Sequence, residues 1–369
     1  MPDSFRATLC GDASAEARIH RDLLDLTHAI QALLGNELVA TVLLGGYARG
    51  EGSIVEHEKQ LGPYNDYDLV VVVRSNARAH HEGLRHVAES WSKRLGVEVD
   101  VWPVAADDLN PPPRILLWLD AALGGARVLA GDEHVLDAVR RLDVRDIPLG
   151  ESGRLLANRA VGLALSNLEA DHDLRRARHG HKMILALGDV YLLAANRYAG
   201  TLAARMKELD TLGASPAVGT ELVSAYQDAI AFRARPDLWK PATSLDAWYE
   251  ATRELARARH LSFEAFRVGS PATPLGYATF SKSVYPEPIG LRTGASIGAS
   301  IRARIKVGVP LWPYAGHPRE RLARVAMLLA YEPQETASRE KAAALLGIGH
   351  NATDQELHER VRALSGVGG

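Results

Sequence analysis

Three aspartates on two short apolar segments could together bind a divalent cation. Asp66 and Asp68 flank Tyr67 shortly before the run Val70–Val73, and Asp100 lies between two valines. Side chains alternate across a strand, so Asp66 and Asp68 are expected on one face and Tyr67 in the core. If the Asp100 segment pairs beside this strand, its carboxylate joins the other two. Clustered acids repel each other in low dielectric and Mg²⁺ removes that cost, so the pattern predicts a two-metal site suited to phosphoryl or nucleotidyl transfer.

A glycine-rich turn before the aspartates could cradle a phosphate. Gly45 and Gly46 end a buried apolar segment, and Arg49, Glu51 and Ser53 follow. Glycines at a strand-to-helix turn let backbone N–H groups approach a phosphate, and a helix N-terminus favours negative charge. Arg49 either contacts phosphate or pairs with Glu51, and Ser53 either caps a helix or binds the ligand. P-loop and dinucleotide-binding motifs do not fit, because neither a Gly-Lys-Ser/Thr string nor a complete Gly-x-Gly-x-x-Gly string follows.

The elements expected around these residues form a mixed sheet. Apolar periodicity and turn signals predict helices over 13–34, 76–95 and 111–123, and strands over 37–44, 66–74, 97–101 and 127–129. The helix–strand order up to about residue 135 predicts a mixed sheet with helices over one face.

A helical pattern follows from residue 150. Helices are expected over 152–171, 175–200, 222–232 and 245–260 and again from Pro318, and the string from Thr353 to Glu356 fits the capping box of a last helix to about residue 364. Gly, Ser, Thr and Pro take 18 of the 40 positions from Leu261 to Ser300, which predicts an irregular segment over about 261–300. The expected fold class is α+β, with a mixed-sheet domain over 1–140 and a mainly helical domain over 150–369.

Composition and charge exclude several classes of protein. The 369 residues are 47% hydrophobic and 24% charged, which is typical of globular chains, and the formal charge of -2 does not favour long nucleic acid or anionic lipid as a partner. Cys10 is the only cysteine, so an intrachain disulfide or a cysteine-based zinc site is excluded and a reducing compartment is expected. Without a signal-like segment or an apolar run of about 18 residues, we expect a cytoplasmic protein with no membrane partner.

Taken together, the motifs resemble those of the DNA polymerase β-type nucleotidyltransferase superfamily. The strings that carry the resemblance are Gly45–Glu51, Asp66–Val71 and Val99–Val101, within roughly residues 15–135. The resemblance implies that Asp66 and Asp68 bind both catalytic Mg²⁺ ions, and that Asp100 ligates the catalytic ion and helps deprotonate the acceptor. It also implies that Gly45 and Gly46 contact the β- and γ-phosphates of a nucleoside triphosphate (NTP).

The chain departs from the superfamily pattern at two places. Members more often carry Ser at the position of Gly46, where its hydroxyl touches the triphosphate, although uridylyltransferase-type members share the Gly-Gly-Tyr-x-Arg-Gly-Glu string. The spacing from Gly46 to Asp66 is longer than in compact members, so residues 57–64 are expected to be an insertion near the site that shapes acceptor or nucleotide choice.

Candidate residues in the helical part are fewer. In superfamily polymerases of the poly(A) and cyclic-oligonucleotide types, a lysine of the helical domain reaches the triphosphate. Lys182, which shares a helix face with Arg178 and Asp189, is the candidate here, and a solvated face is the alternative. His179 and His181 cannot share one ligand-facing side of a helix, so surface histidines are expected.

Two further features of the helical part have plain alternatives. Tyr198 either stacks on a base or packs as a core or rim aromatic. Residues 300–330 hold six basic side chains against one acid, which either meet a polyanion or are solvated: Arg302, Arg304, Lys306, Arg319, Arg321 and Arg324.

The resemblance implies a Mg²⁺-dependent transferase that moves a nucleoside monophosphate (NMP) from an NTP such as ATP to an unidentified acceptor, a small molecule or a protein, and releases pyrophosphate. Two Mg²⁺ ions are expected, for which Mn²⁺ can substitute. One alternative is a synthase of a nucleotide second messenger. Another, of a different class, is a non-catalytic nucleotide-binding sensor or an antitoxin-like partner protein. The sequence predicts no oligomeric state.

Overall fold

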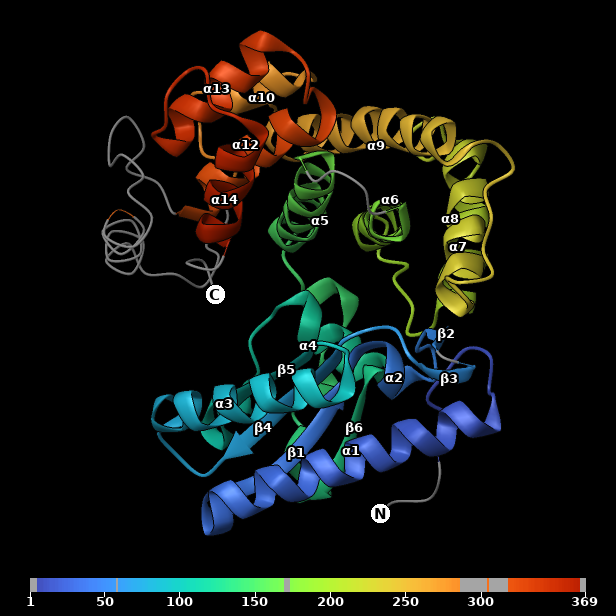
Figure 1. The fold of residues 1–369 in the computed structure, drawn as a ribbon, viewed down its shortest axis with the longest axis vertical. Coiled ribbons are helices and arrows are strands. Elements are labelled where there is room, and N and C mark those ends of the chain that lie inside the picture. The colour runs from blue at the N-terminus through green and yellow to red at the C-terminus, as the bar shows by residue number, and fades with distance from the viewer. Residues whose placement is uncertain (1–4, 58, 169–172, 286–303, 305–317, 366–369) are drawn as a thin grey trace. The chain divides into compact units, whose positions relative to one another are not determined.

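The computed structural model describes the chain except residues 1–4, 58, 169–172, 286–303, 305–317 and 366–369, and the chain divides into two units. Unit 1 comprises Met1–Ile147 together with two later segments, Asn196–Glu208 and Ile230–Trp239. Unit 2 comprises Pro148–Ala195, Leu209–Ala229 and Lys240–Gly369. The α+β class is confirmed, because one part carries a mixed sheet with flanking helices and the remainder is mostly helical (Figure 1).

Unit 1 is built on a four-stranded sheet with the strand order β5-β4-β1-β6. Its strands are β1 (Leu38–Leu44), β4 (Tyr67–Val73), β5 (Val99–Ala105) and β6 (Ala126–Gly131). β1 pairs antiparallel with both β4 and β6, whereas β4 and β5 run parallel, so the sheet is mixed as the sequence predicts. Helix α3 (Ala77–Leu95) makes the crossover that parallel neighbours require.

Both faces of this sheet are covered. On one face, Ile19 and Leu23 of α1 (Ala13–Leu34) and Leu84 of α3 share a core with Tyr67 of β4. On the other face, Trp118 of α4 (Leu116–Asp120) packs in a second core that includes alternate valines of β1 and β4. The prediction that helices cover one face is therefore wrong, because short helical turns between β5 and β6 cover the second face.

The helix expected over 111–123 is also shorter than predicted. α4 begins only at Leu116, and a kinked turn over Ala121–Gly125 leads directly into β6. The string Pro111–Pro113 explains the late start, because a residue that precedes proline is pushed out of the α region.

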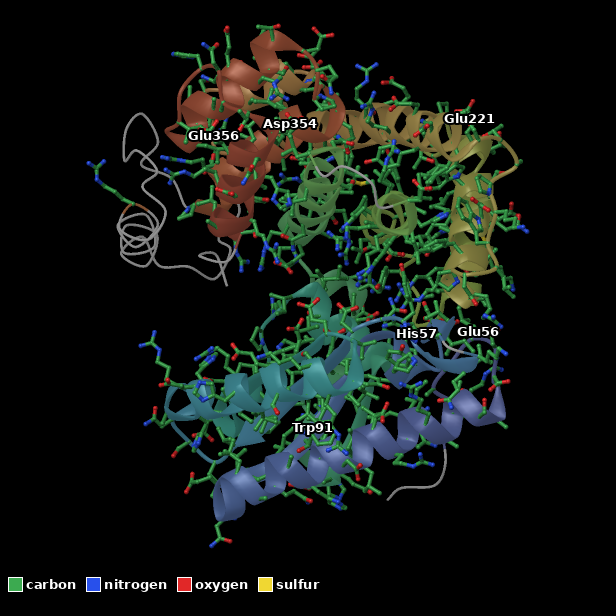
Figure 2. All side chains as sticks on the ribbon, in the orientation of Figure 1. Glu56, His57, Trp91, Glu221, Asp354 and Glu356 are labelled. Carbon is green, nitrogen blue, oxygen red and sulfur yellow. The ribbon has the colours of Figure 1, made fainter. Side chains whose placement is uncertain are left out.

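The segment expected to be an insertion is part of a β-hairpin. β2 (Ile54–His57) pairs antiparallel with β3 (Gln60–Pro63), and Glu56 and His57 lie at the end of β2 (Figure 2). The late segment Ile230–Trp239 belongs to the same unit: Glu56 N–H donates to Asp237 Oδ2 at 3.1 Å. The hairpin therefore brings the end of helix α8 (Gly219–Ala234) into unit 1.

Unit 2 is helical over its described residues. Its helices include α5 (Gly150–Leu168), α6 (Asp173–Ala194), α9 (Leu245–Val268), α10 (Pro274–Thr279), α12 (Pro318–Tyr331), α13 (Thr336–Leu346) and α14 (Asp354–Ser365), while α7 (Leu202–Leu212) and α8 each have one part in unit 1. α5 packs against α6 and α12, and the side-chain amide of Asn167 donates to Leu329 O at 2.9 Å. The expected capping box is confirmed, since Glu356 N–H donates to Thr353 Oγ1 at 3.2 Å and the Glu356 carboxylate accepts from Thr353 N–H at 2.8 Å.

Two expectations about the later part of the chain are wrong. The irregular segment does not begin at residue 261, because α9 continues to Val268 and α10 follows, while residues 286–300 lie outside the described part. The solvated alternative for the basic stretch is wrong for Arg321 and Arg324 of α12, which are buried, and Arg324 Nη1 donates to Phe280 O at 2.7 Å. Arg304 is exposed. Arg302 and Lys306 lie outside the described residues. No helix in the described ranges is both long and apolar enough to cross a membrane.

The prediction of surface histidines on α6 is wrong for His181, which is 2% exposed and packs against the Trp248 ring at 4.5 Å between centroids. Burial lowers the pKa of His181 to about 3. Burial, assisted by Lys182 and neighbouring arginines, lowers the pKa of the half-buried His179 to about 4. His260 of α9 is also buried, and burial lowers its pKa to about 3. Unit 2 thus folds around neutral histidines.

Unit 2 is expected to lose stability as the pH falls below about 6.5, the pKa of an unfolded histidine. The folded pKa values of these histidines are depressed, so only the unfolded chain takes up protons in the window between about pH 6.5 and pH 4. Each histidine contributes a slope of at most about 1.4 kcal/mol per pH unit. Urea unfolding of unit 2, followed by hydrogen exchange of α6 and α9 peptides, measures the slope. His181→Gln should flatten it, and an equal slope in that variant would contradict the assignment.

Candidate functional site

The three aspartates predicted from the sequence lie together at one end of the sheet. Asp68 of β4 lies opposite Asp100 of the parallel strand β5, which is the pairing that the sequence argument required, and Asp66 directly precedes β4. Each residue offers one carboxylate oxygen, and these oxygens all lie within 4.8 Å of one another. Asp66 and Asp68 are half-buried, whereas Asp100 is exposed. The fold thus brings together, on adjacent strands, the three carboxylates that could hold a metal ion.

The alternation of β4 explains the direction of these carboxylates. Tyr67 and Leu69 are fully buried in the core beneath α1 and α3, so the neighbouring Asp68 projects toward the opposite face. The Tyr67 ring lies 5.0 Å from the ring of Tyr47, between centroids, and both rings are buried. Apolar packing under the strand therefore sets the orientation of the acids above it.

The glycine turn follows β1 as the short helix α2 (Gly45–Arg49), directly beside the aspartates. Leu44, the residue before the turn, is paired with Asp68. Gly45 has a φ of +73°, and a Cβ there would lie 3.1 Å from Asp68 Oδ2. Gly46 has no positive φ, but a Cβ there would overlap Nη2 of Arg233. The two glycines thus admit a carboxylate and a guanidinium to adjacent positions of one turn.

Tyr47 ties this turn to the aspartates. Its hydroxyl donates to Ser53 O at 2.9 Å and accepts from the backbone N–H groups of Tyr64 at 3.1 Å and Asn65 at 3.2 Å. Burial raises the pKa of Tyr47, so the hydroxyl keeps its proton and remains a donor. The Tyr47 hydroxyl therefore fixes the chain directly before Asp66.

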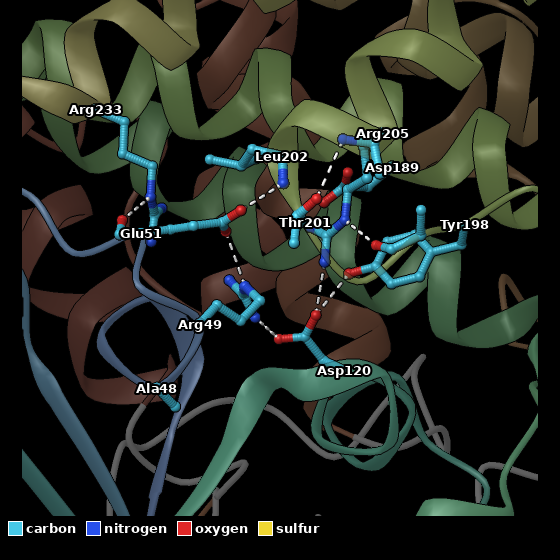
Figure 3. A network of polar contacts seen from close by, with 12 residues as sticks. Ala48, Arg49, Glu51, Asp120, Asp189, Tyr198, Thr201, Leu202, Arg205 and Arg233 are labelled. Atoms are coloured by element: carbon cyan, nitrogen blue, oxygen red, sulfur yellow. Dashed lines mark hydrogen bonds and ion pairs between the residues drawn. The ribbon is translucent and has the colours of Figure 1, made fainter. Parts of the chain in front are cut away.

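Arg49 lies in a network of ion pairs with Glu51 and Asp120 (Figure 3). Arg49 Nε donates to Glu51 Oε2 at 2.9 Å, and Nη1 pairs with Asp120. Asp120 Oδ1 also accepts from Arg205 Nη2 at 2.7 Å and from the Tyr198 hydroxyl at 3.1 Å. Burial disfavours the Asp120 carboxylate, but Arg49, Arg205 and Tyr198 outweigh it and hold its pKa below the usual value. Arg49 thus pairs with Glu51, the second of its two predicted alternatives, and a phosphate contact stays a prediction.

The other predicted site residues have different surroundings. Ser53 is 1% exposed, donates from its backbone N–H to Asn65 Oδ1 at 3.1 Å and leads into β2, so the prediction of a helix cap is wrong and ligand binding stays a prediction. Lys182 lies on α6 in unit 2, and its role stays a prediction. Tyr198 is a packed aromatic, buried beneath the Arg205 guanidinium at 4.1 Å.

Three charged residues of this region escaped the sequence analysis. Asp120 is an acid within an apolar run, the same signal that singled out Asp100, and it could have been found in that way. Arg205 and Arg233 come from the two late segments of unit 1, where no local pattern marks them. Only the folded chain brings them to the glycine turn.

The chemistry open to this arrangement follows from its parts. The three carboxylates can bind a hard cation, and the guanidinium of Arg233 at the glycine turn can bind an anion such as a phosphate. No protein-family model matches the chain, and no curated protein matches it. Only the residues and their geometry therefore bear on function.

Proposed function

We propose that unit 1 has the fold and activity of a DNA polymerase β-type nucleotidyltransferase, which moves an NMP from an NTP such as ATP to an acceptor and releases pyrophosphate. The observation that carries the proposal is the pairing of Asp68 with Asp100 on parallel strands, directly beside Gly45. An acidic cluster alone is common on proteins. Here a glycine turn lies beside the acidic cluster and leaves space for the Arg233 guanidinium. A metal-bound polyphosphate would need both the acids and a cation.

The residues present fit Mg²⁺. Octahedral Mg²⁺ binds oxygen at about 2.0–2.1 Å, so two oxygens on one ion lie at most about 4.2 Å apart. The three carboxylate oxygens, within 4.8 Å of one another, reach that spacing by small side-chain rotations. Mg²⁺ or Mn²⁺ bound here would supply Lewis-acid stabilisation of the transferring phosphoryl group and of the leaving pyrophosphate.

The chain's own residues then divide the remaining work. Asp100 is exposed, so its carboxylate can accept the proton of an acceptor hydroxyl or phosphate as the acceptor oxygen attacks the α-phosphorus. The new phosphorus–oxygen bond forms as the bond to the β-phosphate bridging oxygen breaks. Leu44 of β1 pairs with Asp68 of β4, and the Tyr47 hydroxyl fixes the chain that leads into β4, so both keep the acids in place before the substrate binds.

The experiment that tests the proposal is pyrophosphate release by the full chain. Each NTP is supplied with Mg²⁺ or Mn²⁺, alone and with pools of small molecules or proteins, and mass spectrometry finds whatever gains the mass of a nucleotide, including the chain itself. Release with transfer to an added acceptor or to the chain supports the proposal. Release from NTPs alone with oligonucleotide products would identify a second-messenger synthase. Tight NTP binding without release under any condition would overturn the proposal in favour of a sensor.

A further inference from the structure

The guanidinium of Arg233 occupies the space that a side chain at position 46 would fill. A Cβ on Gly46 would overlap Arg233 Nη2, and it would lie 3.4 Å from the Arg233 guanidinium carbon. Arg233 comes from the last turn of α8, in the late segment of unit 1, and its Nε donates to Glu51 O at 3.0 Å (Figure 3). That bond orients the guanidinium across the glycine turn.

We propose that Arg233 is a polyphosphate-binding residue of the glycine turn, and that it takes the place of a side chain at position 46. The inference rests on the proposed function for its ligand, the triphosphate of an NTP. Arginine suits this role because its planar fork can donate two parallel hydrogen bonds to phosphate oxygens.

The charges around Arg233 leave a place for an anion. Arg49 and Arg205 are matched by the carboxylates of Glu51 and Asp120, which accept their hydrogen bonds. Arg233 is a third cation. Within the described part of the chain, the hydrogen bond that its Nε donates goes to the neutral backbone carbonyl of Glu51. Burial and the repulsion of Arg49 lower the pKa of Arg233, and the attraction of the Glu51 carboxylate offsets them only in part. A bound phosphate would offset both effects.

Arg233 also lies on the correct side of the aspartates for a bridging ligand. A Cβ at position 45 would meet Asp68 Oδ2, and a Cβ at the next residue along the turn, Gly46, would overlap Arg233 Nη2. A polyphosphate held at the acids would therefore present its remaining oxygens to Arg233.

The test is the affinity for inorganic triphosphate without metal, measured by calorimetry on the full chain. Arg233→Met keeps an unbranched side-chain stem and removes the charged guanidinium, and it should raise Kd about 10- to 100-fold, as expected for a charge-assisted bidentate contact. Arg233→Lys should lose less, because the charge remains while the fork is lost. The matched control is Arg235→Met, since Arg235 pairs with Asp237 at 2.7 Å, and it should leave Kd unchanged. Equal binding by Arg233→Met and wild type, or an equal loss in Arg235→Met, would overturn the inference.

A double-mutant cycle tests the claim about position 46. Gly46→Ser should weaken triphosphate binding in the wild-type chain, because its Cβ displaces the guanidinium, yet cost nothing further in Arg233→Met. Independent, additive losses would show that the two side chains do not compete for the same space.

The outcomes also separate the two proposals. Triphosphate binding that depends on Arg233 without any pyrophosphate release would sink the proposed function alone. Transfer with an unchanged KM for NTP in Arg233→Met would sink this inference alone.

Discussion

Asp68→Asn is expected to lower nucleotidyl transfer by more than about a hundredfold. A residue that only supports a metal ligand typically costs about 10- to 100-fold when it is removed, and Asp68 is proposed as a ligand itself. Asparagine keeps the shape of the Asp68 side chain while it removes the charge that would hold Mg²⁺. The measurements are the rate of pyrophosphate release and the binding of Mn²⁺ by calorimetry, and both should fall together.

The fold should survive this substitution. Tyr67 and Leu69 carry the core packing of β4, and asparagine matches the shape of aspartate, so the urea midpoint of unit 1 should change little. The matched control is Asp107→Asn, an exposed acid in the turn that follows β5, which should leave both activity and Mn²⁺ binding unchanged. Equal turnover by Asp68→Asn and the wild type would refute the metal site.

The core of the candidate site was predictable because its signals are local. Asp66 and Asp68 stand at the start of an apolar strand, and one condition, a neighbouring strand for Asp100, was enough to complete the cluster. The long helices α1 and α3 could likewise be predicted from the periodicity of their apolar residues, because each helix buries one apolar face.

The remainder could not be predicted because it depends on contacts between segments far apart in the chain. Arg205 pairs with Asp120, and Arg233 donates to the backbone carbonyl of Glu51, only after the two late segments join unit 1. No pattern near either arginine specifies that partner. Which side chains are buried could not be predicted from the sequence for the same reason. His181 lies on a helix that other helices surround, so it is buried although its spacing suggested solvent.

Asp120→Ala is expected to destabilise unit 1 by about 3–5 kcal/mol, the cost of removing one partner from a buried ion pair. The Asp120 side chain is 19% exposed, and it accepts hydrogen bonds or ion pairs from Arg49, Arg205 and Tyr198. Without it, two guanidiniums that are 8% and 4% exposed lose a carboxylate. Because Arg205 and Tyr198 come from the late segment Asn196–Glu208, that segment should open first.

Hydrogen exchange in increasing urea measures this effect separately for each part of the chain. Peptides from β1, β4 and residues 196–208 should lose protection at lower urea in Asp120→Ala, whereas peptides from α5 and α12 should not. Asp137→Ala is the matched control. Asp137 pairs with Arg140 at 47% and 54% side-chain exposure, so this substitution should cost about 0–1 kcal/mol.

Folding lowers the pKa of Asp120, so the stability that its carboxylate contributes is complete above the unfolded pKa of about 3.9 and is lost as the pH falls through the folded pKa. The difference between wild type and Asp120→Ala should therefore be constant near pH 7 and shrink only below about pH 4. A difference that shrinks already near neutral pH would show that another group holds the late segment in place.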